Sequence, residues 1–221
     1  MRASPASTSS RCRPCSREHR RRAPSLRGVS EPAPPARCDT RQRLDVLREA
    51  ARLGVPHDYG RTRALRIVRE PRELVCVGED IHARHQWLAP RAARAFVRLR
   101  DAAAHDGVEL QLVSAFRSAE YQLGILKRKL ERGQSVEEIL RVSAAPGYSE
   151  HHSGRVVDLT TPGYAALEEE FEHSPAFAWL ARRAREFGFV LSYPRGNRHA
   201  IAYEPWHWCW HARSSSRGAT A

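Results

Sequence analysis

The sequence lacks the features that mark several classes of protein. No apolar run approaches the roughly 20 residues of a membrane-spanning helix, so no transmembrane segment is predicted. Cysteine is scarce after residue 43, where only Cys76 and Cys209 occur, and this argues against a disulfide framework. No internal repeat is present, which argues against a repeat architecture. The 221 residues, 41% of them hydrophobic, are enough for one domain with a core.

Acidic residues are scarce in the first 43 residues. Eleven arginines stand there against Glu18, Glu31 and Asp39, so the segment carries +8 (11 − 3) of the total net charge of +12. Six prolines and seven serines accompany them without apolar periodicity, which predicts disorder. No apolar core follows the arginines, as a secretory signal would require. An organelle transit peptide, which the prolines fit poorly, and upstream sequence translated from a misplaced start remain as alternatives.

The positive net charge of the chain raises the question of nucleic-acid binding. That function would depend on the leader alone, because the remaining residues carry only +4 (12 − 8) of net charge. No aromatic residues are interleaved with the basic ones, so nucleic-acid binding is not expected. The chain is therefore predicted to have three segments: a disordered Arg/Ser/Pro-rich leader at residues 1–43, a folded domain at residues 44–212, and a flexible tail at residues 213–221.

Helix signals come first in the body of the chain, and strand signals dominate its end. Apolar periodicity, caps and closing glycines predict helices at residues 40–54, 89–107, 117–133, 135–140 and 174–188. Strands are predicted at residues 73–78, 108–116, 154–160, 189–194 and 200–210. The last helix is expected to bury Phe177, Leu180, Ala181 and Ala184. This order favours an α+β fold: a small single domain with a central antiparallel sheet flanked by helices.

The stretch "SEHHSGRVVDLT", residues 149–160, holds the first residues that could bind a metal ion. His151 and Asp158 are seven positions apart, and in an unbroken strand an odd offset places two side chains on opposite faces. A bend between them would bring them together, and Gly154 tolerates one. A histidine and an aspartate that converge suit a zinc ion.

The stretch "YEPWHWCW", residues 203–210, offers a second pair. Pro205 disfavours a helical conformation at Glu204, so this is not the helical His-Glu-x-x-His arrangement. It offers His207 as a ligand and a carboxylate three residues earlier. A third stretch, "SAFRSAEYQ", residues 114–122, places Arg117 at a predicted strand–helix junction, where an arginine can clamp a carboxylate with two hydrogen bonds.

The blocks "SAFRS", "PGYSEHHSGRVVDL", "FGFVLSYP" and "YEPWHW" have the order and spacing seen in D-alanyl-D-alanine carboxypeptidases of the VanY type, which the chain resembles over about residues 45–211. The family pattern is Ser-x-His-x-x-Gly-x-x-x-Asp followed by Glu-x-x-His. The residues that match it are Ser149, His151, Gly154, Asp158, Glu204 and His207. The resemblance implies a small α+β fold, one zinc ion and cleavage of D-Ala-ended cell-wall peptides.

The resemblance also implies a role for each matched residue. The implied zinc ligands are His151, Asp158 and His207, with a fourth position left for water. The implied general base is Glu204, and Arg117 would bind a substrate carboxylate or stabilise the oxyanion. Weaker candidates for substrate contacts are Ser149 and Gln122. His152 falls where relatives often carry a polar residue that is not a ligand, and Arg155, Val156 and Cys209 depart from the usual family residues.

The function that the resemblance implies is a zinc-dependent D,D-carboxypeptidase acting on peptidoglycan stem peptides. A D-Ala-D-Ala dipeptidase and an L,D-endopeptidase remain alternatives, because the sequence does not show which bond is cleaved. A non-catalytic, zinc-stabilised cell-wall-binding module is a further alternative. Glu204 argues against it, because structural zinc sites usually take four protein ligands and need no base. A monomer is expected. The substrate class implies the periplasm or cell envelope, yet no export signal is visible, so the cytoplasm stays open.

Overall fold

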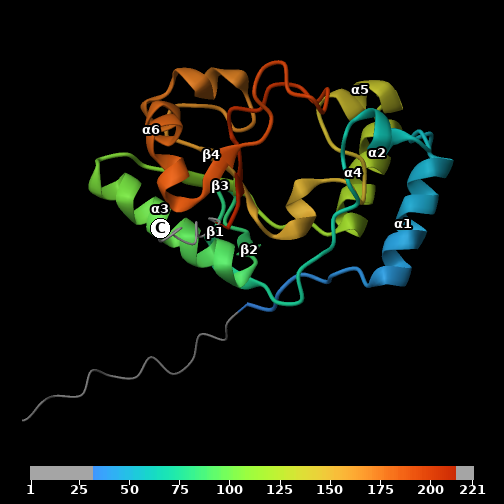
Figure 1. Ribbon diagram of the computed structural model, residues 1–221, viewed down its shortest axis with the longest axis horizontal. Helices are drawn as coiled ribbons and strands as arrows, with labels where there is room; N and C mark the ends of the chain where they lie inside the picture. Colours follow the sequence, from blue (N-terminus) through green and yellow to red (C-terminus); the bar gives the residue numbers. More distant parts are fainter. Residues whose placement is uncertain (1–31, 213–221) are drawn as a thin grey trace, which may run out of the picture. The chain divides into compact units, whose positions relative to one another are not determined.

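A four-stranded antiparallel sheet lies at the centre of the fold, in a computed structural model that describes residues 32–212 (Figure 1). Its strands are β3 (Gln111–Ser114), β4 (Val156–Thr160), β5 (Phe189–Leu191) and β6 (His207–Trp210), in the order β3-β4-β6-β5. All neighbouring pairs are antiparallel. The predicted α+β class is therefore confirmed, and the two central strands, β4 and β6, are those that carry Asp158 and His207.

Two helices pack against this sheet and share a hydrophobic core with it. Helix α3 (Pro90–His105) begins with proline at its first position and buries Phe96, Leu99 and Ala103, as predicted. Helix α6 (Pro175–Arg183) is capped by Ser174, whose hydroxyl accepts a hydrogen bond from the Phe177 N–H at 3.0 Å. A short 3₁₀ helix, η3 (Ala184–Phe187), continues it.

The predicted buried face of the last helix was partly wrong. Ala181 is exposed, whereas Ala176 and Trp179 are buried together with Leu180. Phe177 is half-buried against the core, and Ala184 is buried in η3. The buried stripe is thus centred about one position earlier than the sequence pattern suggested, and it includes Trp179, whose indole N–H donates to Asp106 at 2.7 Å.

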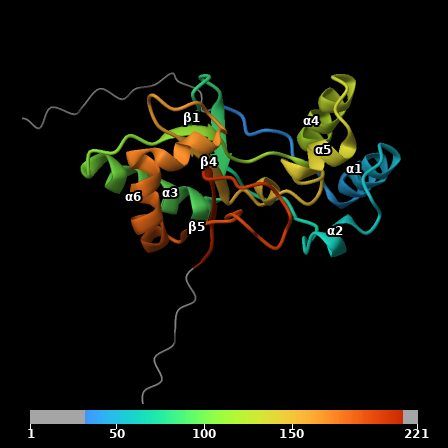
Figure 2. The ribbon, with the colours of Figure 1, turned by 90° about the horizontal axis from the view of Figure 1, so that it is seen from above.

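A second group of helices encloses a separate hydrophobic cluster. Its members are α1 (Thr40–Arg52), α2 (Tyr59–Thr62), α4 (Ala119–Glu131) and α5 (Val136–Arg141). The predicted capping box of α5 is present, since Ser135 and Glu138 exchange side chain–backbone hydrogen bonds at 2.8 and 3.2 Å. Figure 2 shows α1, α4 and α5 on one side of the strands and α3 and α6 on the other.

Several elements differ from the sequence predictions. Strand β1 (Val75–Glu79) pairs only with β2 (His85–Leu88), which was not predicted, and the two form a separate antiparallel sheet. The strand predicted at residues 200–210 begins only at His207. Two more short 3₁₀ helices, η1 (Glu150–Ser153) and η2 (Glu169–His173), also escaped prediction. Single 3₁₀ turns contain too few residues to show a helical period.

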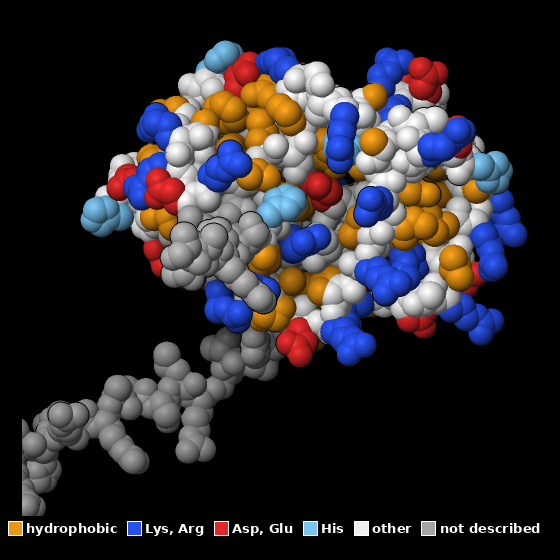
Figure 3. All heavy atoms as spheres, viewed as in Figure 1, with side chains coloured by type: hydrophobic (Ala, Val, Ile, Leu, Met, Phe, Trp, Pro, Cys, Tyr) orange, Lys and Arg blue, Asp and Glu red, His pale blue; other side chains and the backbone are white. Residues whose placement is uncertain are grey.

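The surface and the helix lengths add two observations. Basic side chains are spread among acidic and apolar ones over the face seen in Figure 3, so that face has no continuous basic stripe. Within residues 32–212, no helix combines the length and the hydrophobicity that crossing a bilayer would take.

The folded part starts earlier than the predicted boundary at residue 44. Asp39 caps α1 by accepting a hydrogen bond from the Gln42 N–H at 2.8 Å, and its own N–H donates to the side-chain oxygen of Gln42 at 2.8 Å. Cys38 is buried, and its N–H donates to Glu70 at 2.6 Å. The helix predicted at residues 40–54 already crossed that boundary, which followed the arginine- and proline-rich composition of residues 1–43. Residues 1–31 and 213–221, where the other leader and tail predictions fall, lie outside the described residues.

We expect a chain that starts at residue 32 to be more stable than one that starts at residue 44. The shorter chain loses the Asp39 cap, which is worth about 1 kcal/mol, together with the buried side chain of Cys38. Thermal denaturation of the two truncated proteins should show a Tm lower by several degrees for the shorter one. Equal Tm values would show that the cap and Cys38 contribute nothing.

Candidate metal centre

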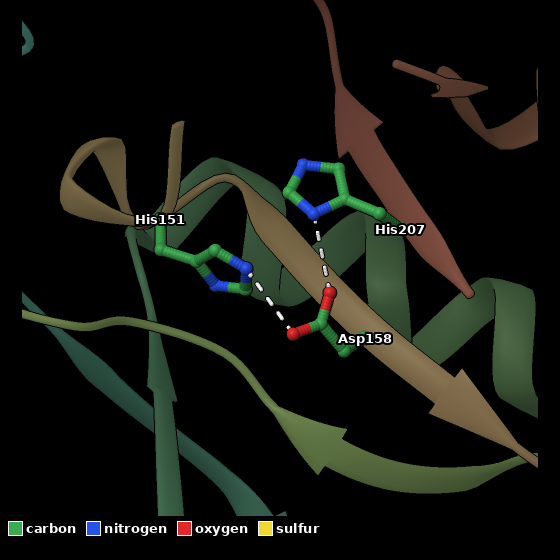
Figure 4. Close-up of side chains that lie close together, drawn as sticks. All are labelled: His151, Asp158 and His207. Carbon is green, nitrogen blue, oxygen red and sulfur yellow. Dashed lines mark ion pairs between the residues drawn. The ribbon is translucent and has the colours of Figure 1, made fainter. Parts of the chain in front are cut away.

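The three predicted ligands lie close together, two of them on strands of the sheet and one in η1. His151, Asp158 and His207 are all buried, and one ligand atom from each lies within 4.8 Å of the others. His151 Nε2 is 3.2 Å from Asp158 Oδ2, and His207 Nδ1 is 3.2 Å from Asp158 Oδ1. Figure 4 shows the two imidazole rings facing the carboxylate from different sides. Their nitrogen and oxygen lone pairs therefore converge on one small volume.

Backbone geometry explains how residues so far apart in sequence meet. Asp158 and His207 are direct partners in the antiparallel register of β4 and β6. His151 comes from η1, which ends at Gly154 with φ of 63°. This left-handed conformation turns the chain into β4, and the Ala89 N–H donates to the Gly154 carbonyl at 2.8 Å. The predicted bend at Gly154 is present, although His151 lies in a 3₁₀ helix rather than in a strand.

His151 presents a free lone pair to the cluster. Its Nδ1–H donates to the Ala115 carbonyl oxygen at 2.5 Å, which leaves Nε2 without a proton. Burial, reinforced by the charge of Arg117, lowers the pKa of His151 to about 4, so the ring is neutral at pH 7. Burial would raise the pKa of Asp158, but the hydrogen bond and the charge of His207 hold it well below its usual range.

This arrangement fits a metal ion. The acceptor Nε2 of His151 faces the Asp158 carboxylate across 3.2 Å, and two acceptors at that distance repel unless a cation lies between them. Among the described residues, neither His151 Nε2 nor Asp158 Oδ1 has a hydrogen-bond partner. Two imidazole nitrogens and a carboxylate oxygen form a donor set that suits zinc.

His207 is surrounded by carboxylates. Besides Asp158, its Nδ1 lies 3.3 Å from Glu204 Oε2, and its Nε2 lies 3.1 Å from Glu150 Oε2. Burial alone would lower the pKa of His207, but Asp158, Glu150 and Glu204 together raise it to about 10. Glu150 was not among the predicted site residues. Its contact spans 57 positions in sequence, so no local spacing indicated it.

Glu204 reaches the cluster through a tight turn. The His207 N–H donates to the Glu204 carbonyl at 3.1 Å, and Pro205 occupies the second position of the turn, where its fixed φ is favoured. Burial raises the pKa of Glu204 to about 7, although the charge of His207 partly opposes this shift. A carboxyl group with a pKa near neutrality suits proton transfer.

Arg117 lies at the opposite side of the carboxylate, in the segment between β3 and α4, as predicted. Its Nη2 is 3.5 Å from Asp158 Oδ2, and its Nε has no hydrogen-bond partner among the described residues. His152 holds the backbone of this segment, because its Nδ1–H donates to the Arg117 carbonyl at 2.7 Å. His152 Nε2 accepts from the Gly147 N–H at 3.1 Å, so both of its nitrogens are engaged away from the cluster.

Ser149 and Gln122 line the same cleft as Arg117, Glu204 and the three predicted ligands. The Ser149 hydroxyl accepts a hydrogen bond from the His151 N–H at 3.4 Å and so caps η1. The Gln122 amide donates to the Ser143 hydroxyl at 2.9 Å and to the Ala144 carbonyl at 3.1 Å. Both residues support the walls of the cleft, and Gln122 Oε1 remains without a partner in the described part of the chain.

The departures from the family pattern lie beside the cluster. Val156 and Cys209 are register partners on β4 and β6, and both are buried. They therefore form one apolar cross-strand pair, whereas Arg155 is exposed. Six other histidines match no ligand position of the family pattern, and all lie outside the metal-binding group found among the described residues. They are His82, His85, His105, His173, His199 and His211.

The match to a protein family shows the class of protein that carries this fold and the buried His-Asp-His group. A family model described as VanY, D-alanyl-D-alanine carboxypeptidase, matches residues 85–213, which is more than half of the 221 residues. The chain belongs to this family.

Individual relatives match part of the chain. A D-alanyl-D-alanine carboxypeptidase of Enterococcus faecalis (strain ATCC 700802 / V583) is 31% identical over 120 residues, which are 50% of this chain and 43% of the relative. The protein YodJ of Bacillus subtilis (strain 168) is 32% identical over 127 residues, 55% of this chain and 45% of YodJ. The chain thus spans less than half the length of these curated relatives.

Two solved structures share the fold. The LdcB LD-carboxypeptidase matches with a TM-score of 0.58 at 28% identity, over 64% of this chain and 69% of that one. The vancomycin resistance D,D-pentapeptidase VanY from the VanB-type cassette, solved in complex with Zn(II), matches with a TM-score of 0.52 at 26% identity. That match covers 66% of this chain and 84% of the pentapeptidase.

We expect the purified protein to bind about one zinc ion per chain. The variants His151→Ala and His207→Ala should lose this ion, because each substitution removes one of the three converging donors. The control is His105→Ala, whose side chain is 89% exposed. Metal analysis after gel filtration measures the content. Full zinc retention in both cluster variants would exclude this site.

Gly154→Ala should destabilise the protein more than Gly133→Ala. Both glycines have positive φ, of 63° and 82°, so alanine in the left-handed conformation at either position should lower the free energy of unfolding by about 1–2 kcal/mol. Only at Gly154 would the new Cβ also meet a backbone atom, the Ala89 nitrogen at 3.0 Å, since nothing lies within 4 Å at Gly133. Thermal denaturation of the two variants tests this expectation, and an equal decrease in Tm for both would contradict it.

Proposed function

We propose that the protein is a zinc-dependent D,D-carboxypeptidase that removes the terminal D-alanine from D-Ala-D-Ala-ended peptidoglycan peptides. The observation that carries the proposal is the Glu204 carboxyl group, which is buried beside His207 at the edge of the His-Asp-His group. A metal site that served only to stabilise the fold would need no such group. Family membership and the activity in the name of the Enterococcus faecalis relative support the choice of substrate.

The proposed ligands are His151, Asp158 and His207, which leave the fourth position of a tetrahedral zinc site open. When bound there, zinc would supply a Lewis acid that lowers the pKa of a water molecule toward about 7 and polarises the scissile carbonyl. The neutral Nε2 of His151 and the ionised carboxylate of Asp158 are already in the protonation states that metal ligands require.

Glu204 serves as the general base in this proposal. Its carboxylate accepts a proton from the attacking water and passes it to the nitrogen of the leaving D-alanine. The Glu204–His207 turn holds the carboxyl group against the cluster, at 3.3 Å from His207 Nδ1, without making it one of the three converging ligands. Burial keeps bulk water away from this transfer.

Arg117 serves to bind the carboxylate at the end of the substrate. Its contact with Asp158 is long, at 3.5 Å, and its Nε is unpartnered among the described residues, so donors remain free for a second carboxylate. A fixed cation next to the cluster would favour substrates that end in a free carboxylate, which is the requirement of an exopeptidase. Ser149 and Gln122 are the proposed further contacts in the cleft.

Mass spectrometry of products from a peptidoglycan pentapeptide tests the reaction. Release of one D-alanine, abolished by a chelator and restored by zinc, is the expected result. Release of the D-Ala-D-Ala dipeptide would indicate a dipeptidase, and cleavage within the stem an endopeptidase. A tetrapeptide substrate belongs in the same assay, because the LD-carboxypeptidase LdcB shares the fold. No cleavage of any substrate by zinc-loaded protein would favour a non-catalytic cell-wall-binding module.

Glu204→Gln should keep the zinc and lose most hydrolysis. Glutamine preserves the size of the side chain and one acceptor oxygen, but it takes up no proton at neutral pH. Loss of a general base costs roughly 100- to 10,000-fold in rate. Zinc content and pentapeptide turnover are measured together, with Glu137→Gln on the exposed surface of α5 as the control. Wild-type turnover in Glu204→Gln would exclude the base, and loss of zinc would make Glu204 a ligand.

A further inference from the structure

Glu150 is the carboxylate on the outer side of His207. Its Oε2 lies 3.1 Å from Nε2 of that ring, whereas the three converging ligand atoms meet on the side of Nδ1. Figure 4 shows this second ring nitrogen pointing away from Asp158. The Glu150 side chain is 28% exposed, so it is largely removed from water. Glu150 therefore contacts a candidate ligand without facing the metal position.

We propose that Glu150 is a positioning residue, which accepts the Nε2–H of His207 and thereby directs the Nδ1 lone pair to the metal. An imidazole that binds a metal through one nitrogen carries its proton on the other, and a partner for that proton determines which nitrogen is free. A carboxylate acceptor also makes the ring a stronger donor. The inference rests on the proposed zinc site and extends it to a residue outside the three ligands.

The two histidines would then use different nitrogens, each selected by the acceptor behind the ring. For His151 the acceptor is the Ala115 carbonyl at Nδ1, so Nε2 faces Asp158. For His207 the acceptor is Glu150 at Nε2, so Nδ1 faces Asp158. A carbonyl is neutral and belongs to the backbone, whereas Glu150 is charged and can be removed by mutation. Only the contact between Glu150 and His207 can therefore be tested directly by mutation.

The placement of Glu150 is built into the fold. It lies in η1, one residue before His151, and Ser149 caps that short helix. One 3₁₀ turn thus supplies a ligand and also the acceptor that orients another ligand. The backbone on the His207 side of the contact is held as well, because the Ser192 N–H donates to the His207 carbonyl at 3.3 Å.

The test compares the zinc dissociation constants of wild-type protein, Glu150→Ala and Glu150→Gln, measured by competition with a chromogenic chelator. Loss of an outer acceptor of this kind weakens metal binding by roughly 10- to 100-fold. We expect a loss in that range for Glu150→Ala and a smaller one for Glu150→Gln, whose amide oxygen still accepts the Nε2–H. The absorption spectrum of the cobalt-substituted protein should shift in Glu150→Ala, because the orientation of a ligand changes.

Two controls separate positioning from other effects. Glu120→Ala removes an exposed carboxylate that lines the cleft, and this variant should bind zinc within about threefold of wild type. The Tm of the metal-free proteins is measured in parallel and should be similar in Glu150→Gln and wild type.

Unchanged zinc affinity in Glu150→Ala would overturn the inference. If that variant does not fold, Glu150→Gln decides, and wild-type affinity together with an unshifted cobalt spectrum would overturn it. A lower metal-free Tm with unchanged affinity would assign Glu150 a structural role instead. Failure of the wild-type chain to bind zinc would overturn both this inference and the proposed function, whereas the other outcomes leave the proposed function intact.

Discussion

The antiparallel pairing of β4 with β6 is the constraint on which the site depends. Direct partners in an antiparallel pair hold their Cβ atoms about 4.5–5.5 Å apart, and Asp158 and His207 are such partners in the centre of the sheet. Central strands have both edges paired, so the backbone under these side chains has little freedom to move. A polar pair that would be costly to bury elsewhere is therefore held in one geometry.

The rest of the cluster is arranged around that pair. Gly154 turns the chain so that η1 delivers His151 to one side of the carboxylate, and Pro205 turns it so that Glu204 reaches the other histidine. The helices contribute indirectly. α3 and α6 bury the sheet, while α4 and its neighbours form the opposite wall of the cleft. Residues of α4 and of the strands β2, β3, β4 and β6 line the cleft, and the cluster faces into it.

Much of the architecture could be predicted because its signals are local. The caps of α5 and α6, the proline that begins α3 and the apolar stripe on α3 all depend on residues a few positions apart. The predictions that failed concern short or context-dependent elements. Strand β2 has only four residues, too few to show a clear strand pattern. The apolar pattern of α6 did not indicate that Trp179 would be buried beside Asp106, which lies 73 positions away in sequence.

The sequence by itself determined the residue types of the candidate site, their order and the turn residues between them: the motif around His151 and Asp158, and Glu204 three positions before His207. Only the tertiary structure decided which nitrogen of each histidine faces Asp158, that His152 serves the backbone of Arg117, and that Glu150 lies behind His207. The physical reason is that ring orientation depends on hydrogen-bond partners 35 to 57 residues away, which only the packing of η1 against the sheet brings within reach.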